Sequence, residues 1–135
     1  MSLNALGVSQ LNGKAGSGAG YSFTSGAYAG VSSARYDEIL GTATLNAGTI
    51  AIALSALDIP SAVVASACIT EAWLSNTAAG AGVGTIGAKY VGVIAYAAGP
   101  PATATLTINA QDGTGALVAT STGNIAFRVL IPRNV

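Results

Sequence analysis

Short runs of β-favouring residues recur along this chain, with turn residues between them at intervals of about 8 to 12 positions. In 103–108 threonine alternates with alanine, leucine and isoleucine, and in 125–131 every second residue is large and apolar. A period of two places one side of a strand in a core and the other side outside it. No long amphipathic helix is available to cover a parallel sheet. The runs therefore predict an all-β fold, a single antiparallel β-sandwich or jelly-roll domain.

The same alternation predicts which side chains of each strand point inward. The expected faces are Ile50, Ile52 and Leu54 in 49–55; Val91 and Val93 against Tyr90, Ile94 and Tyr96 in 89–98; and Ile125, Phe127, Val129 and Ile131 against Arg128. A short strand is expected at 116–120. Residues 41–45 and 49–55 are separated by Asn46-Ala47-Gly48, a connection typical of a hairpin.

The run from Ala62 to Ser75 is ambiguous between strand and helix. Its alanine, leucine and glutamate content favours a helix, whereas its β-branched residues favour a strand. We predict a strand, on which Glu71 interrupts an otherwise apolar face that includes Ile69 and Trp73.

Residues 1–36 differ in character from the β-sandwich domain expected at 37–135. Glycine, serine and alanine dominate, and 16–20 has the composition of a flexible linker. An extended arm with apolar contact points and a disordered tail are both open readings. The candidate contact residues, which would bind the capsid or another subunit, are Leu3, Leu6, Val8, Leu11, Tyr21, Phe23 and Tyr28 in this segment, together with Trp73 in the domain.

The balance of charge indicates a protein that is covered by other protein. The 135 residues fit one domain, and hydrophobic residues make up 51% of them, but charged residues only 7%, with five cations and five anions. A typical domain has about 25% charged residues, which keep a soluble monomer from associating.

The sequence also argues against several partners. Five scattered cations argue against binding of nucleic acid. Residues 61–74 are too short to span a membrane, and 1–10 lack the features of a signal peptide. Cys68 is the only cysteine, so no internal disulfide is expected.

The residues needed for common catalytic and metal chemistry are scarce, and we expect no enzyme, no cofactor and no metal. The chain has no histidine, which removes the commonest general base and metal ligand. Asp37 and Glu38 are adjacent and point to opposite faces of a strand, while Asp58 and Asp112 lie in turn sequences. Glu71 is expected on a solvent or interface face; if buried, it needs a partner such as Arg128, Lys89 or a neighbouring subunit.

A glycine-rich motif and several aromatic residues could each indicate a binding site, but an ordinary structural role is the better explanation for both. Residues 82–87 match G-x-G-x-x-G, but a strand follows them and no acidic residue lies 20 positions on, so a floppy glycine-rich loop is the better reading than a dinucleotide site. Tyr90 and Tyr96 could stack on a sugar, although such aromatic residues more often pack in a core or interface. Trp73 suits a core anchor or an interface hot spot equally.

The string from Gly41 to Thr49, followed by a β-rich run, resembles the opening of small β-sandwich modules in virion proteins of tailed phages. These modules occur in capsid decoration (cement) proteins and in fibre proteins. The resemblance covers 37–135, including 61–64 and the closing strand 125–131, and the glycine-rich segment before it is a departure. It implies a decoration protein on the capsid exterior, made in the host cytoplasm and forming a homotrimer that binds the major capsid protein. It carries over no catalytic residues.

Three functions follow as alternatives. A capsid cement protein is the first, a tail-fibre or receptor-binding module for host-surface glycan the second, and a polysaccharide hydrolase the third. The missing histidine and the lack of an obvious acid pair argue against the hydrolase.

Overall fold

The computed structural model describes residues 15–26, 36–54, 59–75, 89–120 and 123–132. Within these ranges no helix is long and apolar enough to cross a membrane. The elements are β1 (Ala15–Gly18), β2 (Tyr21–Gly26), β3 (Tyr36–Thr44), β4 (Thr49–Ala53), α2 (Ala62–Ala67), β5 (Ile69–Leu74), β6 (Lys89–Ala97), β7 (Thr103–Gln111) and β8 (Asn124–Pro132). Strands dominate, and the prediction of an all-β fold is confirmed.

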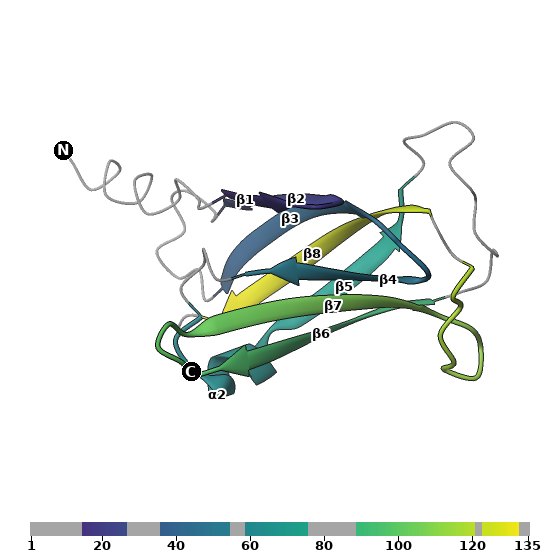
Figure 1. The fold of residues 1–135 in the computed structure, drawn as a ribbon. Coiled ribbons are helices and arrows are strands. Elements are labelled where there is room, and N and C mark those ends of the chain that lie inside the picture. The colour runs from purple at the N-terminus through teal and green to yellow at the C-terminus, as the bar shows by residue number, and fades with distance from the viewer. Residues whose placement is uncertain (1–14, 27–35, 55–58, 76–88, 121–122, 133–135) are drawn as a thin grey trace.

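Two antiparallel sheets share one hydrophobic core. The five-stranded sheet has the order β1-β2-β3-β8-β5, and the three-stranded sheet has the order β4-β7-β6. In Figure 1, β4, β7 and β6 cross in front of β8 and β5. The largest fully buried side chains come from both sheets and from residues next to them: Ile39, Leu45, Ile52, Leu54, Leu106, Ile108, Ile125, Phe127 and Val129.

The inward and outward faces of β6, β7 and β8 follow the alternation of the sequence. Along β7 the even-numbered residues from Ala104 to Ala110 are buried, and along β8 the odd-numbered residues from Ile125 to Ile131 are buried. On β6, Tyr90, Ile94 and Tyr96 pack against this core, and Val93 is exposed. Period-two patterning was therefore sufficient to assign the faces.

The turn at 46–48 connects the two sheets, so the expected hairpin between 41–45 and 49–55 is wrong. β3 pairs with β2 and β8, whereas β4 pairs with β7. Ala47 and Gly48 have φ of 52° and 81°, a conformation that favours glycine. A Cβ atom on Gly48 would lie 2.2 Å from the carbonyl oxygen of Val118. The turn is tight, as predicted, but it passes the chain to the other layer.

A short helix replaces the first half of the strand predicted at 62–75. Ser61 caps α2, its Oγ accepting a hydrogen bond from the Val64 backbone N–H at 3.2 Å. The helix buries Val64 and Ala65 and leaves Val63 exposed. The strand reading was wrong here because a serine cap and alanine-rich composition outweighed the β-branched residues; from Ile69 onward the strand is present as β5.

Strands β1 and β2 belong to the five-stranded sheet, although both fall within the segment expected to be a separate arm. β2 pairs with β3 in register from Tyr21–Ala43 to Gly26–Glu38. The Phe23 side chain is only 3% exposed and lies in the core, over Gly16, where a Cβ would meet its ring at 2.2 Å. Residues 15–26 are thus part of the domain, and the rest of 1–36, apart from Tyr36, lies outside the described residues.

Each edge strand of the three-stranded sheet makes a hydrogen bond with a side-chain hydroxyl of the five-stranded sheet. Tyr21 Oη accepts a hydrogen bond from the backbone N–H of Ala53 on β4 at 3.3 Å. Thr70 Oγ1 donates to the carbonyl oxygen of Gly92 on β6 at 2.8 Å. Unpaired edge groups invite pairing with another chain. These two contacts link the sheets, and each satisfies one backbone group at an edge.

The turn after β7 contains Asp112, as its sequence predicted. Asp112 Oδ1 accepts hydrogen bonds from Thr114 N and Oγ1, at 2.8 and 2.6 Å, and from Ala116 N at 3.0 Å. The Thr114 side chain contributes most to lowering the pKa of this carboxyl, followed by backbone N–H groups. The strand expected at 116–120 is reduced to a bridge between Leu117 and Gln111.

Candidate functional site

The outward side of the five-stranded sheet, here called the outer face, gathers large apolar side chains. Four of the eight exposed large hydrophobic residues in the described ranges lie on it: Tyr36, Leu40, Ile69 and Trp73, which are 40–48% exposed. The register explains the grouping, because Glu38, Leu130 and Ile69 form one row across β3, β8 and β5, and Thr42, Ala126 and Trp73 form another. Exposed apolar residues scattered singly are ordinary, whereas a group on one face indicates an interaction site.

An ion-pair cluster is centred on the row between these two and includes Glu38 of the first row. Arg128 on β8 stands opposite Leu40 on β3 and Glu71 on β5. Its Nε–H donates to Glu38 Oε2 at 2.7 Å, and its Nη1 lies 4.0 Å from Glu71 Oε2. The Glu38 side chain is 15% exposed and that of Glu71 is 55% exposed. One guanidinium is therefore shared by two carboxylates, closely with Glu38 and loosely with Glu71.

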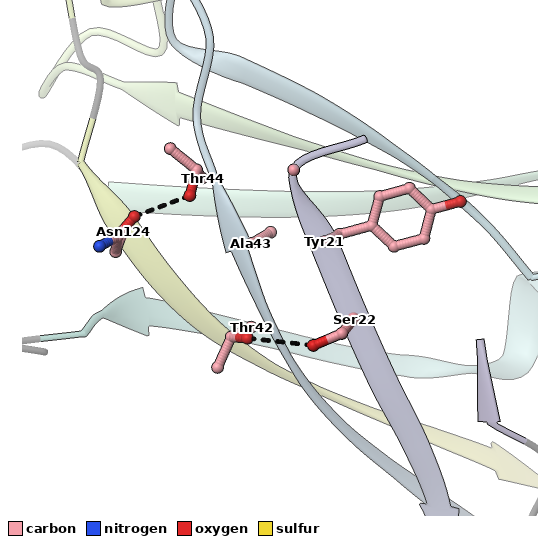
Figure 2. A pocket seen from close by; sticks show the side chains of 7 residues that line it. Tyr21, Ser22, Thr42, Ala43, Thr44 and Asn124 are labelled. Atoms are coloured by element: carbon pink, nitrogen blue, oxygen red, sulfur yellow. Dashed lines mark hydrogen bonds between the residues drawn. The ribbon is translucent and has the colours of Figure 1, made fainter. Parts of the chain in front are cut away.

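Two shallow hollows lie over β2 and β3 beside the apolar group. The first has a volume of about 310 Å³ and is lined by Gly20, Tyr21, Ser22, Thr42, Ala43, Thr44 and Asn124. Figure 2 shows the hydrogen bonds along it, from Thr44 Oγ1 to Asn124 Oδ1 at 2.7 Å and between the Ser22 and Thr42 hydroxyls at 3.4 Å. The second, of about 330 Å³, is lined by Ser22, Phe23, Thr24, Leu40, Gly41 and Thr42. Among the described residues, no carboxylate lines either hollow.

The structure places the sequence-predicted contact residues in three different situations. Trp73 is exposed on the outer face. Phe23 is buried in the chain's own core and Tyr21 packs against that core, with the two rings stacked at 6.4 Å. Phe23 is therefore unavailable to a partner, because its inward direction is fixed by its pairing opposite Gly41. The remaining candidates, Leu3, Leu6, Val8, Leu11 and Tyr28, lie outside the described residues.

Sequence reasoning named Arg128 as a partner for Glu71 but missed Glu38. For Glu71 the sequence left open an exposed face or, if buried, a partner such as Arg128. In the structure Glu71 is exposed and also lies 4.0 Å from Arg128. Glu38 and Arg128 are 90 positions apart, and no local pattern shows that β3 and β8 are neighbours. The one available signal was the alternation along the strand. Ile39 is large and apolar and points inward, so Glu38 and Leu40 on either side of it point outward.

Little in the described part of the chain indicates covalent or metal chemistry. No group of three His, Cys, Asp or Glu side chains there could hold a metal ion. Burial raises the pKa of the Cys68 thiol, and its Sγ–H donates to the Val64 carbonyl oxygen at 3.2 Å, so the reactive thiolate is disfavoured. The predicted glycine-rich loop at 82–87 and the turn carboxylate Asp58 fall outside the described residues.

Comparison of the chain with protein-family models, with curated proteins and with solved structures found no match.

Proposed function

We propose that this chain is a structural protein of a virus particle: a homotrimeric capsid decoration (cement) protein with a β-sandwich domain that binds between subunits of the major capsid protein and has no catalytic role. The observation that carries the proposal is the outer face, where Leu40, Ile69 and Trp73 are exposed together around the ion-pair cluster of Arg128. Protein interfaces combine aromatic and arginine side chains with few unpaired charges at their centre.

The dimensions of the outer face support this use. Strands β2, β3, β8 and β5, with about 4.8 Å between neighbours and about 3.3 Å per residue, span an area on the order of 500 Å² before the relief of side chains is counted. A standard interface buries about 800 Å² per partner. One sheet face is thus large enough for most of a docking surface, and the low overall charge suits a surface covered by protein.

The opposite side of the molecule is also nearly uncharged. The outward residues of the three-stranded sheet are mainly threonine, alanine and valine on β7, β4 and β6, with Lys89 at one end. A subunit that contacts several neighbours needs more than one such side. The low charge on both sides is consistent with a place between coat subunits.

A glycan-binding fibre module is the second candidate, and the first hollow is the observation in its favour. Thr42, Thr44 and Asn124 supply hydroxyl and amide groups there, and Trp73 lies in the same row as Thr42, separated by Ala126. Sugars are bound by such polar groups beside an aromatic ring. Binding of host-surface polysaccharide that is lost in Trp73→Ala, without binding to coat shells, would favour this candidate over the cement protein.

Assembled coat shells that lack this chain provide the test. The protein should bind them in a copy number close to that of the coat sites and should raise the temperature at which they break. The double variant Leu40→Thr and Trp73→Thr should lose this binding. The matched control is Val93→Thr, which changes a 60% exposed residue on the other sheet and should bind normally. Shells that neither bind the protein nor gain stability would refute the proposal.

The first 14 residues can be tested separately. Because residues 15–26 are part of the sheet, a deletion that extends to residue 36 would damage the domain itself. A deletion of 1–14 removes Leu3, Leu6, Val8 and Leu11 and keeps β1. We expect it to weaken shell binding while the melting temperature and the trimer measured by sedimentation are unchanged.

A further inference from the structure

The described residues around Glu71 on the outer face, here called the Glu71 patch, carry a net charge of −1. The patch consists of Glu38, Ile69, Glu71, Trp73 and Arg128. Arg128 is held by Glu38 through the 2.7 Å bond, and Glu71 lies farther away, at 4.0 Å, with more than half of its side chain exposed. Two carboxylates and one guanidinium leave a net charge of −1 in the middle of an apolar surface.

Covering this patch has a consequence for the partner. Glu71 lies between Ile69 and Trp73 along β5, and all three point outward. A partner that covers these apolar neighbours also removes water from the Glu71 carboxylate. A buried carboxylate without a close cation is strongly unfavourable. Arg128 donates to Glu38 at 2.7 Å and lies 4.0 Å from Glu71, so one guanidinium is shared by the two carboxylates. The complementary surface must therefore bring its own positive charge.

The neighbouring tryptophan selects the kind of cation. Trp73 is two residues from Glu71 on the same side of the strand, about 7 Å away along β5. A guanidinium is planar, forms two parallel hydrogen bonds with a carboxylate and stacks on an aromatic ring. It can therefore satisfy Glu71 and contact the Trp73 ring at the same time, which a lysine ammonium does less well.

We infer that the outer face docks a protein partner that presents an arginine to Glu71 and Trp73. A second copy of this chain is the less suitable occupant, because two identical patches would each contribute a net charge of −1. The identity of the partner as coat protein rests on the proposed function, whereas the chemistry of the patch does not. The two can therefore fail independently.

The experiment uses the full chain and two probes. The first is a capped peptide with arginine between leucines, compared with the same peptide carrying lysine or glutamate. Trp73 is the only tryptophan of the chain, so its fluorescence reports binding directly. The second probe is assembled coat shells. The variants are Glu71→Gln and, as the control for the same change in charge, Asp112→Asn, whose amide oxygen can still accept the hydrogen bonds of its turn.

We expect the arginine peptide to bind more tightly than the lysine peptide. The glutamate peptide should not bind. In Glu71→Gln, peptide affinity should fall about two- to fivefold, and shell affinity about 30-fold, because the pair is desolvated there. Raising the salt concentration should weaken wild type more than Glu71→Gln. Asp112→Asn should match wild type in both assays, and melting curves of both variants control for folding.

The outcomes separate the inference from the proposed function. Undiminished shell binding by Glu71→Gln, or equal affinity for the three peptides, overturns the inference and leaves the cement protein intact. Glu71-dependent binding of the arginine peptide without any shell binding overturns the cement protein and supports the inference. Self-association through the outer face that is strengthened in Glu71→Gln identifies a second copy as the occupant, which also overturns the inference.

Discussion

Replacing Gly41 with alanine tests how tightly β2, β3 and β8 fit together. A Cβ atom at this position would lie 2.3 Å from Cζ of Phe127 and 2.5 Å from the carbonyl oxygen of Ser22. Phe127 is 1% exposed, in the centre of the core, and the Ser22 oxygen belongs to the backbone of the neighbouring strand. Neither atom can move away easily, so the added methyl group overpacks the core. We expect the free energy of unfolding to fall by about 1–3 kcal/mol, a large part of the 5–15 kcal/mol typical of a domain.

Urea unfolding followed by Trp73 fluorescence measures this loss. Gly113→Ala is the matched control, because a Cβ at Gly113 meets nothing within 4 Å and should change the stability by less than about 0.5 kcal/mol. Adding Phe127→Leu to Gly41→Ala should recover part of the loss, with a coupling energy of about 0.5–3 kcal/mol. Recovery should be incomplete because the contact with the Ser22 oxygen remains. The packing argument is refuted if Gly41→Ala is as stable as the Gly113→Ala control.

Three further predictions concern the sheet and its turn. Phe23→Ala should lower the free energy of unfolding, measured in urea, by about 3–5 kcal/mol, since the side chain is in the core. A change below about 1 kcal/mol would indicate that this segment is an arm separate from the domain. The double variant Tyr21→Phe and Thr70→Val should lose about 1 kcal/mol per hydrogen bond and associate further in sedimentation, because it leaves one more unpaired backbone group on each of β4 and β6; unchanged sedimentation would argue against a role of the two hydroxyls at the edges. The lowered pKa of Asp112 means that its stabilisation is present above the carboxyl pKa of the unfolded chain and is lost as the pH falls through the folded pKa. Wild type should therefore exceed Asp112→Ala in stability at neutral pH and converge with it in acid, and a constant difference would contradict this.

The candidate site was only partly visible in the sequence. Trp73 could be named as a contact residue, but a core anchor and an interface hot spot were equally good interpretations of a single tryptophan. Phe23 was expected to meet a partner and is instead a core residue, since its pairing opposite Gly41 turns it inward. An aromatic residue in the sequence indicates that its side chain is buried somewhere. Only its neighbours in the folded structure decide whether it is buried in the core of its own chain or in an interface with another chain.

The sequence by itself determined the all-β class, the direction of side chains on β6, β7 and β8, and the turn at Asp112. These features depend on contacts between residues close in the chain: a period of two, or a carboxylate next to backbone N–H groups. Only the tertiary structure decided that β3 and β4 lie in different sheets, that β1 and β2 complete the larger one, and that Glu38, Glu71 and Arg128 meet on one face. Strand order depends on pairing between distant segments, and the free energy of that pairing comes from the joint packing of both sheets, which no local window contains.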